Sequence, residues 1–169
     1  LKPKDEIIRN AHLKKKVYTS KEHIKHFLNT LNFPLYHFDF EAKEFIKILP
    51  SSDELVLSPD QQKIAIADNS ELSVHFLSDQ HEQPPHAKNE QVFLTRFSEP
   101  IQNLSWFNAH YLIFSVGNTI KASEIDNRDR INIVDLAHYP DPQLLWQPNS
   151  TTLYVKSGTN IYASEKLFE

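Results

Sequence analysis

The sequence predicts an all-β chain made of repeated four-stranded antiparallel blades, a partial β-propeller preceded by a short α-helical segment. Three observations support this: one pattern recurs three times, each copy contains two turn signals, and a further strand pattern follows the first two copies. The copies span residues 55–76, 103–124 and 144–165 and align without a gap. Internal repetition at a regular spacing is a strong guide to architecture.

The tight turns of the repeat carry the only two glycines of the chain. Gly117, Gly158 and, in the first copy, Asn69 occupy one column. These residue types tolerate the positive φ that tight hairpin turns require. A second turn, earlier in each copy, carries an Asp or Asn that can cap it with its side chain. These capping residues are Asp60, Asn108 and Asn149. Each copy therefore predicts strand, turn, strand, tight turn, strand.

A fourth strand follows each of the first two copies, at residues 91–97 and 131–136. The copies repeat at 48 and 41 residues, close to the ~40–45 residues that one propeller blade requires, and the polar loop 78–90 accounts for the extra length of the first interval. An antiparallel β-sandwich is the alternative, because short, regularly spaced strands fit both architectures. The predicted units are a half blade at 35–49, blades at 54–97 and 101–136, and an incomplete blade at 143–165. A closed ring takes about four or more blades, so we expect a segment of a larger propeller.

Residues 1–34 differ from the rest because they predict a helix. Thr19 and Glu22 match a capping box, and apolar residues then recur along one helical face. That face consists of Ile24, Phe27, Leu28 and Leu31. We expect this helix to pack against the sheets; docking of a partner is the alternative.

Composition excludes several classes of protein. The net charge of −4 argues against nonspecific nucleic-acid binding. The absence of cysteine excludes disulfides, thiolate metal sites and a cysteine nucleophile within this chain. No apolar run approaches the ~18 residues of a membrane-spanning helix. The chain lacks methionine and begins with Leu1, so we expect a processed product or a piece of something longer.

Catalytic and metal-binding signatures are missing from the sequence. No serine lies in a nucleophile elbow, and two glycines cannot build a phosphate loop. His23 and His26 lack a third zinc ligand at a fixed spacing. Asp126 and Asp129 lack the ligand ladder of a calcium loop. We therefore expect no enzyme, no cofactor and no metal.

Four residues are candidates for binding at the surface. Trp106 and Trp146 lie in neighbouring columns of the repeat and could stack on sugars, although filling the space between blades is the favoured alternative. Arg128 and Arg130 lie in the charged stretch 124–132. For this stretch the favoured alternative is a turn cross-linked by its own Asp–Arg pairs, which contribute little stability when exposed.

A family resemblance rests on the second and third copies. The motifs are 101–106, 111–114, 120–121 and 124–129 with Asn132, then Leu153-Tyr154, Ile161-Tyr162 and Ser164-Glu165. They resemble the WD-type propeller region of PEGA-domain proteins from candidate-phylum bacteria, over residues 35–169 and most closely 101–165. The resemblance implies an envelope protein anchored by an N-terminal membrane helix, with its propeller outside the cytoplasm. It supplies no catalytic residues.

The expected function is a noncatalytic interaction scaffold that binds a protein or an envelope polymer on its blade loops. The alternative is an accessory propeller domain of a hydrolase whose catalytic domain is absent from this chain. Open blade edges also predict self-association, because unpaired strand edges invite pairing with another chain.

Overall fold

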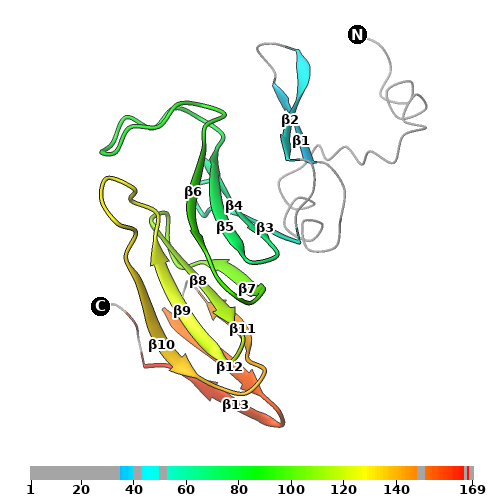
Figure 1. Ribbon diagram of the computed structural model, residues 1–169, viewed down its shortest axis with the longest axis vertical. Coiled ribbons are helices and arrows are strands. Elements are labelled where there is room, and N and C mark those ends of the chain that lie inside the picture. The colour runs from blue at the N-terminus through cyan, green and yellow to red at the C-terminus, as the bar shows by residue number, and fades with distance from the viewer. Residues whose placement is uncertain (1–34, 40–42, 50–52, 148–150, 166, 168–169) are drawn as a thin grey trace, which may run out of the picture.

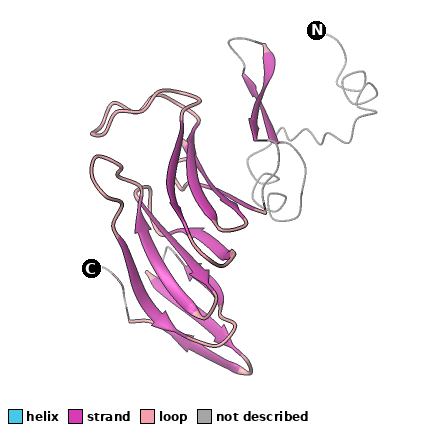
Figure 2. Cartoon of the chain, in the orientation of Figure 1, coloured by secondary structure: helices cyan, strands magenta, loops and turns pink. Residues whose placement is uncertain are grey.

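The computed structural model describes residues 35–39, 43–49, 53–147, 151–165 and 167, and all the regular structure in these ranges is β-strand (Figures 1 and 2). Thirteen strands form one two-stranded hairpin and three antiparallel sheets of three or four strands. The all-β prediction is therefore confirmed. The helix predicted within residues 1–34 lies outside the described residues.

Each sheet is a meander, in which every strand pairs with the next one along the chain. The hairpin consists of β1 (Leu35–Asp39) and β2 (Glu44–Leu49). The first sheet consists of β3 (Glu54–Leu57), β4 (Lys63–Asp68), β5 (Glu71–Phe76) and β6 (Gln91–Arg96). The second consists of β7 (Ile101–Trp106), β8 (Tyr111–Val116), β9 (Thr119–Glu124) and β10 (Ile133–His138). The third consists of β11 (Gln143–Gln147), β12 (Thr152–Ser157) and β13 (Asn160–Ala163).

The three tight turns have the predicted backbone conformation. Asn69, Gly117 and Gly158 have φ values of 51°, 53° and 57°. Each is the first residue of a two-residue loop, between β4 and β5, β8 and β9, and β12 and β13. One column of the sequence therefore specifies the same hairpin three times, and Asn replaces Gly in the first sheet at a position where a left-handed backbone is needed.

The expectation that the copies align without a gap is wrong in the second sheet. Its first turn is one residue shorter than in the other two sheets, and β7 compensates with a register shift in which Asn103 has a φ of 57°. Trp106 thereby becomes the structural equivalent of Leu57 and Trp146. The equivalent pairs are Leu57 with Ile64, Trp106 with Leu112, and Trp146 with Leu153. A β-bulge of this kind absorbs one residue without changing the faces of the strands that follow.

The sheets pack in series, each with one face toward the preceding sheet and the other toward the next. Leu72 and Val74 of the first sheet lie in one core with Phe114 of the second, and Ile120 of the second packs with Leu153 of the third. Along the chain, β3 contacts β7 and β7 contacts β11 (Figure 1). The first strands of successive sheets are therefore neighbours, and every long loop between the third and fourth strands emerges at one end.

The hairpin β1–β2 precedes the first sheet. Phe38 and Phe45 pack edge to face across it, with ring centroids 5.1 Å apart. Ile48 packs against the buried Ile64 and Ile66 of β4. The face of the first sheet that points away from the second is thus already covered in part. The part of the chain described above includes no helix with the length and apolar character needed to cross a lipid bilayer.

Candidate binding cleft at the loop end

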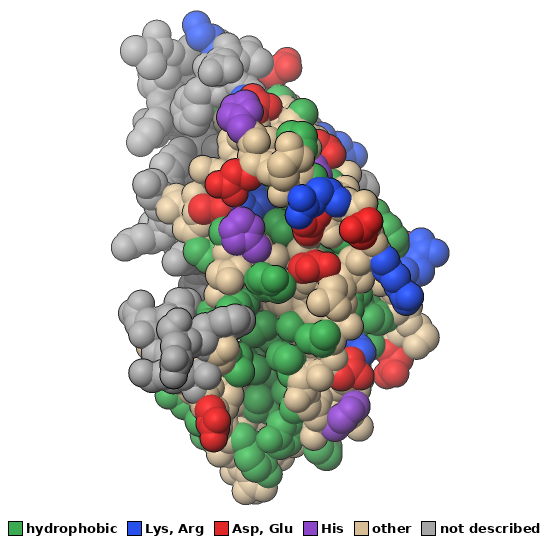
Figure 3. Space-filling view, turned by 90° about the vertical axis from the view of Figure 1, so that its left-hand side faces the viewer, with side chains coloured by type: hydrophobic (Ala, Val, Ile, Leu, Met, Phe, Trp, Pro, Cys, Tyr) green, Lys and Arg blue, Asp and Glu red, His purple; other side chains and the backbone are tan. Residues whose placement is uncertain are grey.

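Two loops from different sheets meet at one end of the molecule. The loop between β5 and β6 and the loop between β9 and β10 lie at the same end of the molecule (Figure 1). Together with the start of β8 they line a cleft of about 360 Å³. In the view of Figure 3, charged and histidine side chains gather toward this end, and hydrophobic ones gather toward the other. The lining includes Lys63, Glu82, His86, Tyr111, Glu124 and Asp126.

The β5–β6 loop is held by its own hydrogen bonds. Gln80 and His86 exchange backbone hydrogen bonds of 2.8 and 3.1 Å. The His86 ring is buried, stacks on Phe76 with centroids 4.2 Å apart, and places Nδ1 3.0 Å from Glu90 Oε1. The hydrogen bond with His86, and one from the Ala87 N–H, lower the pKa of Glu90. His81 of this loop is exposed, whereas His86 is buried.

Lys63 and Asp60 form a fixed ion pair beside the cleft. The Lys63 side chain is buried, and its Nζ lies 2.6 Å from Asp60 Oδ2. Ser58 Oγ and the Gln62 N–H both donate to Asp60 Oδ1. Burial raises the pKa of Asp60, but these hydrogen bonds and the Lys63 charge outweigh burial and hold the pKa below its ordinary value. The turn predicted at Asp60 therefore also neutralises a buried lysine.

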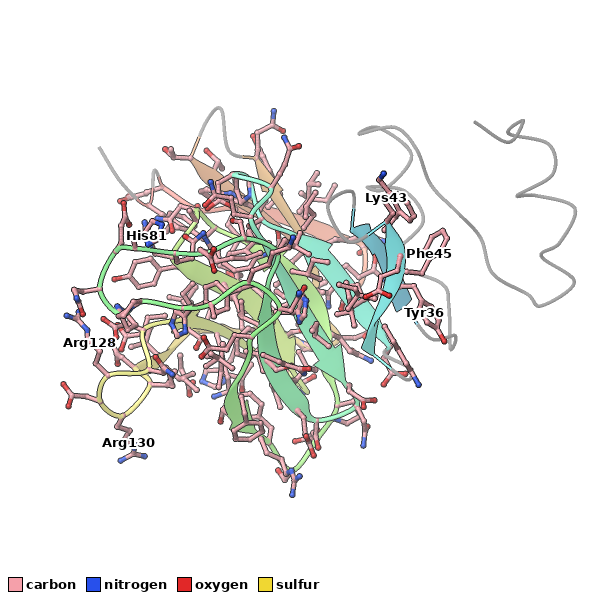
Figure 4. The ribbon with its side chains drawn as sticks, turned by 90° about the horizontal axis from the view of Figure 1, so that it is seen from above. Tyr36, Lys43, Phe45, His81, Arg128 and Arg130 are labelled. Carbon is pink, nitrogen blue, oxygen red and sulfur yellow. The ribbon has the colours of Figure 1, made fainter. Side chains whose placement is uncertain are left out.

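Arg128 and Arg130, both candidates from the sequence, have different surroundings (Figure 4). Arg128 Nε lies 3.0 Å from both carboxylate oxygens of Asp126. These hydrogen bonds lower the pKa of Asp126 to about 2. The cross-linked turn expected from the sequence is thus present at Arg128. Arg130 is exposed and, among the described residues, has no ion-pair partner; it lines a separate hollow of about 420 Å³ beside Leu94.

Trp106 and Trp146 lie between sheets and not in the cleft. Trp106 is 3% exposed, and its indole N–H donates to the Val56 carbonyl of the first sheet at 2.8 Å. Trp146 packs against Phe107 with the rings tilted by 37° and their centroids 4.4 Å apart, and its indole N–H donates to the Phe107 carbonyl at 3.0 Å. The faces of Trp106 are therefore closed to a sugar, and the packing alternative describes both residues. Each indole joins its own sheet to the preceding one.

Tyr111 is the cleft residue that the sequence interpretation missed. It is 41% exposed at the first position of β8, next to the capped turn at Asn108. Its partners across the cleft come from loops that have no periodic pattern, so nothing in the spacing indicated the site. One feature of the sequence could have indicated Tyr111. It is aromatic, whereas the other two copies of the repeat carry the polar residues Lys63 and Thr152 in the same column.

The cleft combines apolar lining residues with polar side chains that are held by partners within the chain. Glu124 accepts a hydrogen bond from the Asn132 N–H at 2.8 Å, Asp126 is held by Arg128, and Lys63 is held by Asp60. Within the described ranges, no group of three His, Asp or Glu side chains could hold a metal ion. Prearranged polar groups around an exposed aromatic ring can orient a ligand. No protein-family model and no curated protein matches the sequence, so this geometry is the basis on which a function is assigned.

Proposed function

We propose that the chain is part of a β-propeller that acts as a noncatalytic interaction scaffold and binds a polypeptide in the loop-end cleft. The observation that carries this proposal is the exposed Tyr111 ring among polar side chains whose positions are fixed by internal partners. Loops mounted on a rigid set of sheets are a common location for binding sites.

The serial arrangement of the sheets supports the propeller. Each sheet is a meander, the first strands of successive sheets are neighbours, and equivalent tryptophans donate to the preceding sheet. Radial repetition of four-stranded sheets has the first two properties, and the two indole hydrogen bonds join successive sheets in this chain. In a sandwich, by contrast, two sheets pack face to face and the series would end with the second.

Several features favour recognition over catalysis at the cleft. Lys63 and Asp126 are each neutralised by a partner within the chain. The His86 ring is buried against Phe76. Tyr111 offers a large apolar ring with a polar tip, the type of side chain that is enriched at protein interfaces. Glu82 and Glu124 lie on the same cleft and favour a ligand with a basic residue.

The resemblance to PEGA-domain proteins extends the proposal to the cell envelope. A propeller outside the cytoplasm would meet secreted proteins and envelope polymers, and the cleft suits an extended chain of either kind. Fractionation of cells producing the full reading frame, followed by protease treatment of intact cells, tests this location. Protection of the propeller from external protease would contradict it.

Binding can be tested with peptides selected from a random display library against the full chain. The selected peptides are expected to bind Tyr111→Ala at least about tenfold more weakly than the parent, because the anchoring aromatic residue of an interface carries ~1–2 kcal/mol or more. Phe93→Ala is the matched control, since Phe93 is also an exposed aromatic residue but lies on β6 and is not among the residues that line the cleft. Peptides that lose affinity with Phe93→Ala and keep it with Tyr111→Ala would place the binding surface elsewhere.

A further inference from the structure

His86 is held by its own loop in a way that engages one of its two ring nitrogens. The ring stacks on Phe76, and Nδ1 lies 3.0 Å from Glu90 Oε1. Glu90 Oε2 accepts a hydrogen bond from the Ala87 N–H at 2.9 Å, and the hydrogen bonds with His86 and Ala87 lower the pKa of Glu90. Because an ionised carboxylate only accepts hydrogen bonds, the proton of neutral His86 lies on Nδ1.

The other nitrogen of this ring, Nε2, is an acceptor that a ligand can use. Among the described residues Nε2 has no hydrogen-bond partner, yet solvent reaches it, although only 6% of the His86 side chain is exposed. His86 lines the cleft, and so does Asp126 on the opposite loop. The pKa of Asp126 is lowered mainly by Arg128 and to a smaller degree by a positive charge on His86. The state of the imidazole is therefore felt across the cleft.

The groups around His86 that remain available to a ligand are mainly acceptors. Lys63 is neutralised by Asp60, and Asp126 by Arg128. Glu82 is exposed without an ion-pair partner among the described residues, and Glu124 uses Oε1 for the Asn132 N–H. The charged and titratable groups that surround His86 are Lys63, Glu82, Glu90, His110, Tyr111, Glu124 and Asp126. The cleft thus combines free carboxylate oxygens with the Nε2 lone pair.

An arginine side chain matches this combination. A guanidinium group carries five N–H donors, no acceptor and a permanent positive charge, and its plane stacks on aromatic rings. Tyr111 supplies such a ring at the cleft, because its side chain is 41% exposed. Lysine offers its donors from a single point and lacks the planar surface. Arginine is therefore the basic residue that can use carboxylates, imidazole and ring together.

From this geometry we infer that His86 makes the cleft selective for an arginine side chain of the bound polypeptide at neutral pH and releases it in mild acid. The inference rests on the proposed function and names the residue that the cleft recognises. Neutral His86 accepts a guanidinium N–H at Nε2. Protonated His86 has no lone pair to offer and repels the guanidinium, so affinity falls as the pH falls. The Nδ1–H group donates to Glu90 in both states, so the loop keeps its structure.

The first test observes the imidazole directly, in the full chain with ¹⁵N-labelled histidine. At pH 7.5 the ring shifts are expected to place the proton of His86 on Nδ1, and the blocked peptide Gly-Ser-Arg-Ser-Gly is expected to move the Nε2 signal. The same peptide with citrulline, which resembles arginine but is uncharged, should bind at least about tenfold more weakly. A proton on Nε2 in the free chain, or equal binding of both peptides, would overturn the inference.

The second test measures the affinity of the arginine peptide between pH 7.5 and 5. A loss of about tenfold is expected as the imidazole takes up its proton. His86→Gln cannot be protonated and should abolish this loss, whereas His110→Gln, at an exposed histidine of the same cleft, should retain it. In the parent chain, which needs no variant to fold, the peptide must shift protonation of His86 to lower pH. A flat profile in the parent, or a loss that persists in His86→Gln, would overturn the inference.

Peptides from the display library separate this inference from the proposed function. Library peptides that need Tyr111 but lack arginine, or that bind equally at pH 7.5 and 5, would leave the cleft as the binding site and overturn only the part assigned to His86. Library peptides whose affinity is unchanged by Tyr111→Ala would contradict the proposed function, and with it this inference.

Discussion

The second and third sheets are copies of one repeat, yet only the second is packed on both faces. Ile120 and Ile161 hold the same place in the two sheets, and one is fully buried while the other is 74% exposed. Their hairpins have nearly identical backbone angles at Gly117 and Gly158. The repeated sequence therefore determines the backbone conformation of each hairpin. The burial of a side chain in this column depends instead on whether another sheet packs against it. Four substitution experiments test this difference between the sheets.

The largest effect is expected from the tryptophans that join successive sheets. Trp106→Ala opens a cavity between the first and second sheets and removes the hydrogen bond to Val56, so it is expected to cost about 3–5 kcal/mol of unfolding free energy. Trp146→Ala should cost less, because Trp146 is only partly buried. Urea unfolding followed by circular dichroism measures both. Equal costs would mean that the two sheet interfaces are equally well packed.

Next come the two isoleucines of the comparison. Ile120→Ala removes a fully buried side chain and is expected to cost about 2–4 kcal/mol. Ile161→Ala changes an exposed side chain and is expected to stay within about 0.5 kcal/mol. The same urea titration gives both values. A large cost at Ile161 in the isolated chain would indicate that the third sheet is already covered.

A smaller effect separates the capped turns of the first and second sheets. Asp60 and Asn108 cap equivalent turns, but only Asp60 can titrate and only Asp60 neutralises a buried lysine. Asp60→Asn is expected to cost about 2 kcal/mol at pH 7, because it leaves Lys63 without its charge partner.

The pH dependence of that substitution has a definite sign. The pKa of Asp60 is lowered in the folded chain, so its contribution is complete above the unfolded value near 3.8 and is lost as the pH falls through the lower folded value. The stability difference between parent and Asp60→Asn should therefore be constant from pH 7 to about 5 and vanish in strong acid. Unfolding midpoints of both proteins from pH 7 to 2 test this. A difference that widens in acid would contradict it.

The smallest effect is expected at the tight turns. Alanine at Gly117 or Gly158 must adopt a positive φ, which costs about 1–2 kcal/mol. A Cβ at Gly117 would also come within 2.7 Å of Glu99 Oε2, whereas one at Gly158 has nothing within 4 Å. Glu99 is an exposed, flexible side chain, so the extra cost at Gly117 should be small. Asparagine, which Asn69 shows to be compatible with this turn, should restore most of the loss at both sites. Thermal unfolding resolves differences of this size.

Periodic features of the fold were predictable, and features that depend on particular loops were not. The strand predicted at 91–97 corresponds to β6, and the half blade predicted at 35–49 corresponds to β1 and β2. The turn column was correct at all three positions. The bulge at Asn103 was missed because one inserted residue and one deleted residue cancel in a gapless alignment. The cleft was missed because it joins loops of two sheets, and the loop conformations depend on individual contacts such as that of His86 with Phe76.

The indole hydrogen bonds run in one direction along the chain. Trp106 reaches back to Val56, and Trp146 reaches back to Phe107, so each donor follows its acceptor in sequence. During synthesis on the ribosome, which proceeds from the N-terminus, the acceptor carbonyl emerges before the tryptophan that donates a hydrogen bond to it. Each new sheet can thus be captured as it leaves the exit tunnel, without waiting for sequence still to be translated. Because the copies are similar in sequence, a sheet could otherwise pack against the wrong copy. Assembly in chain order reduces this misassembly.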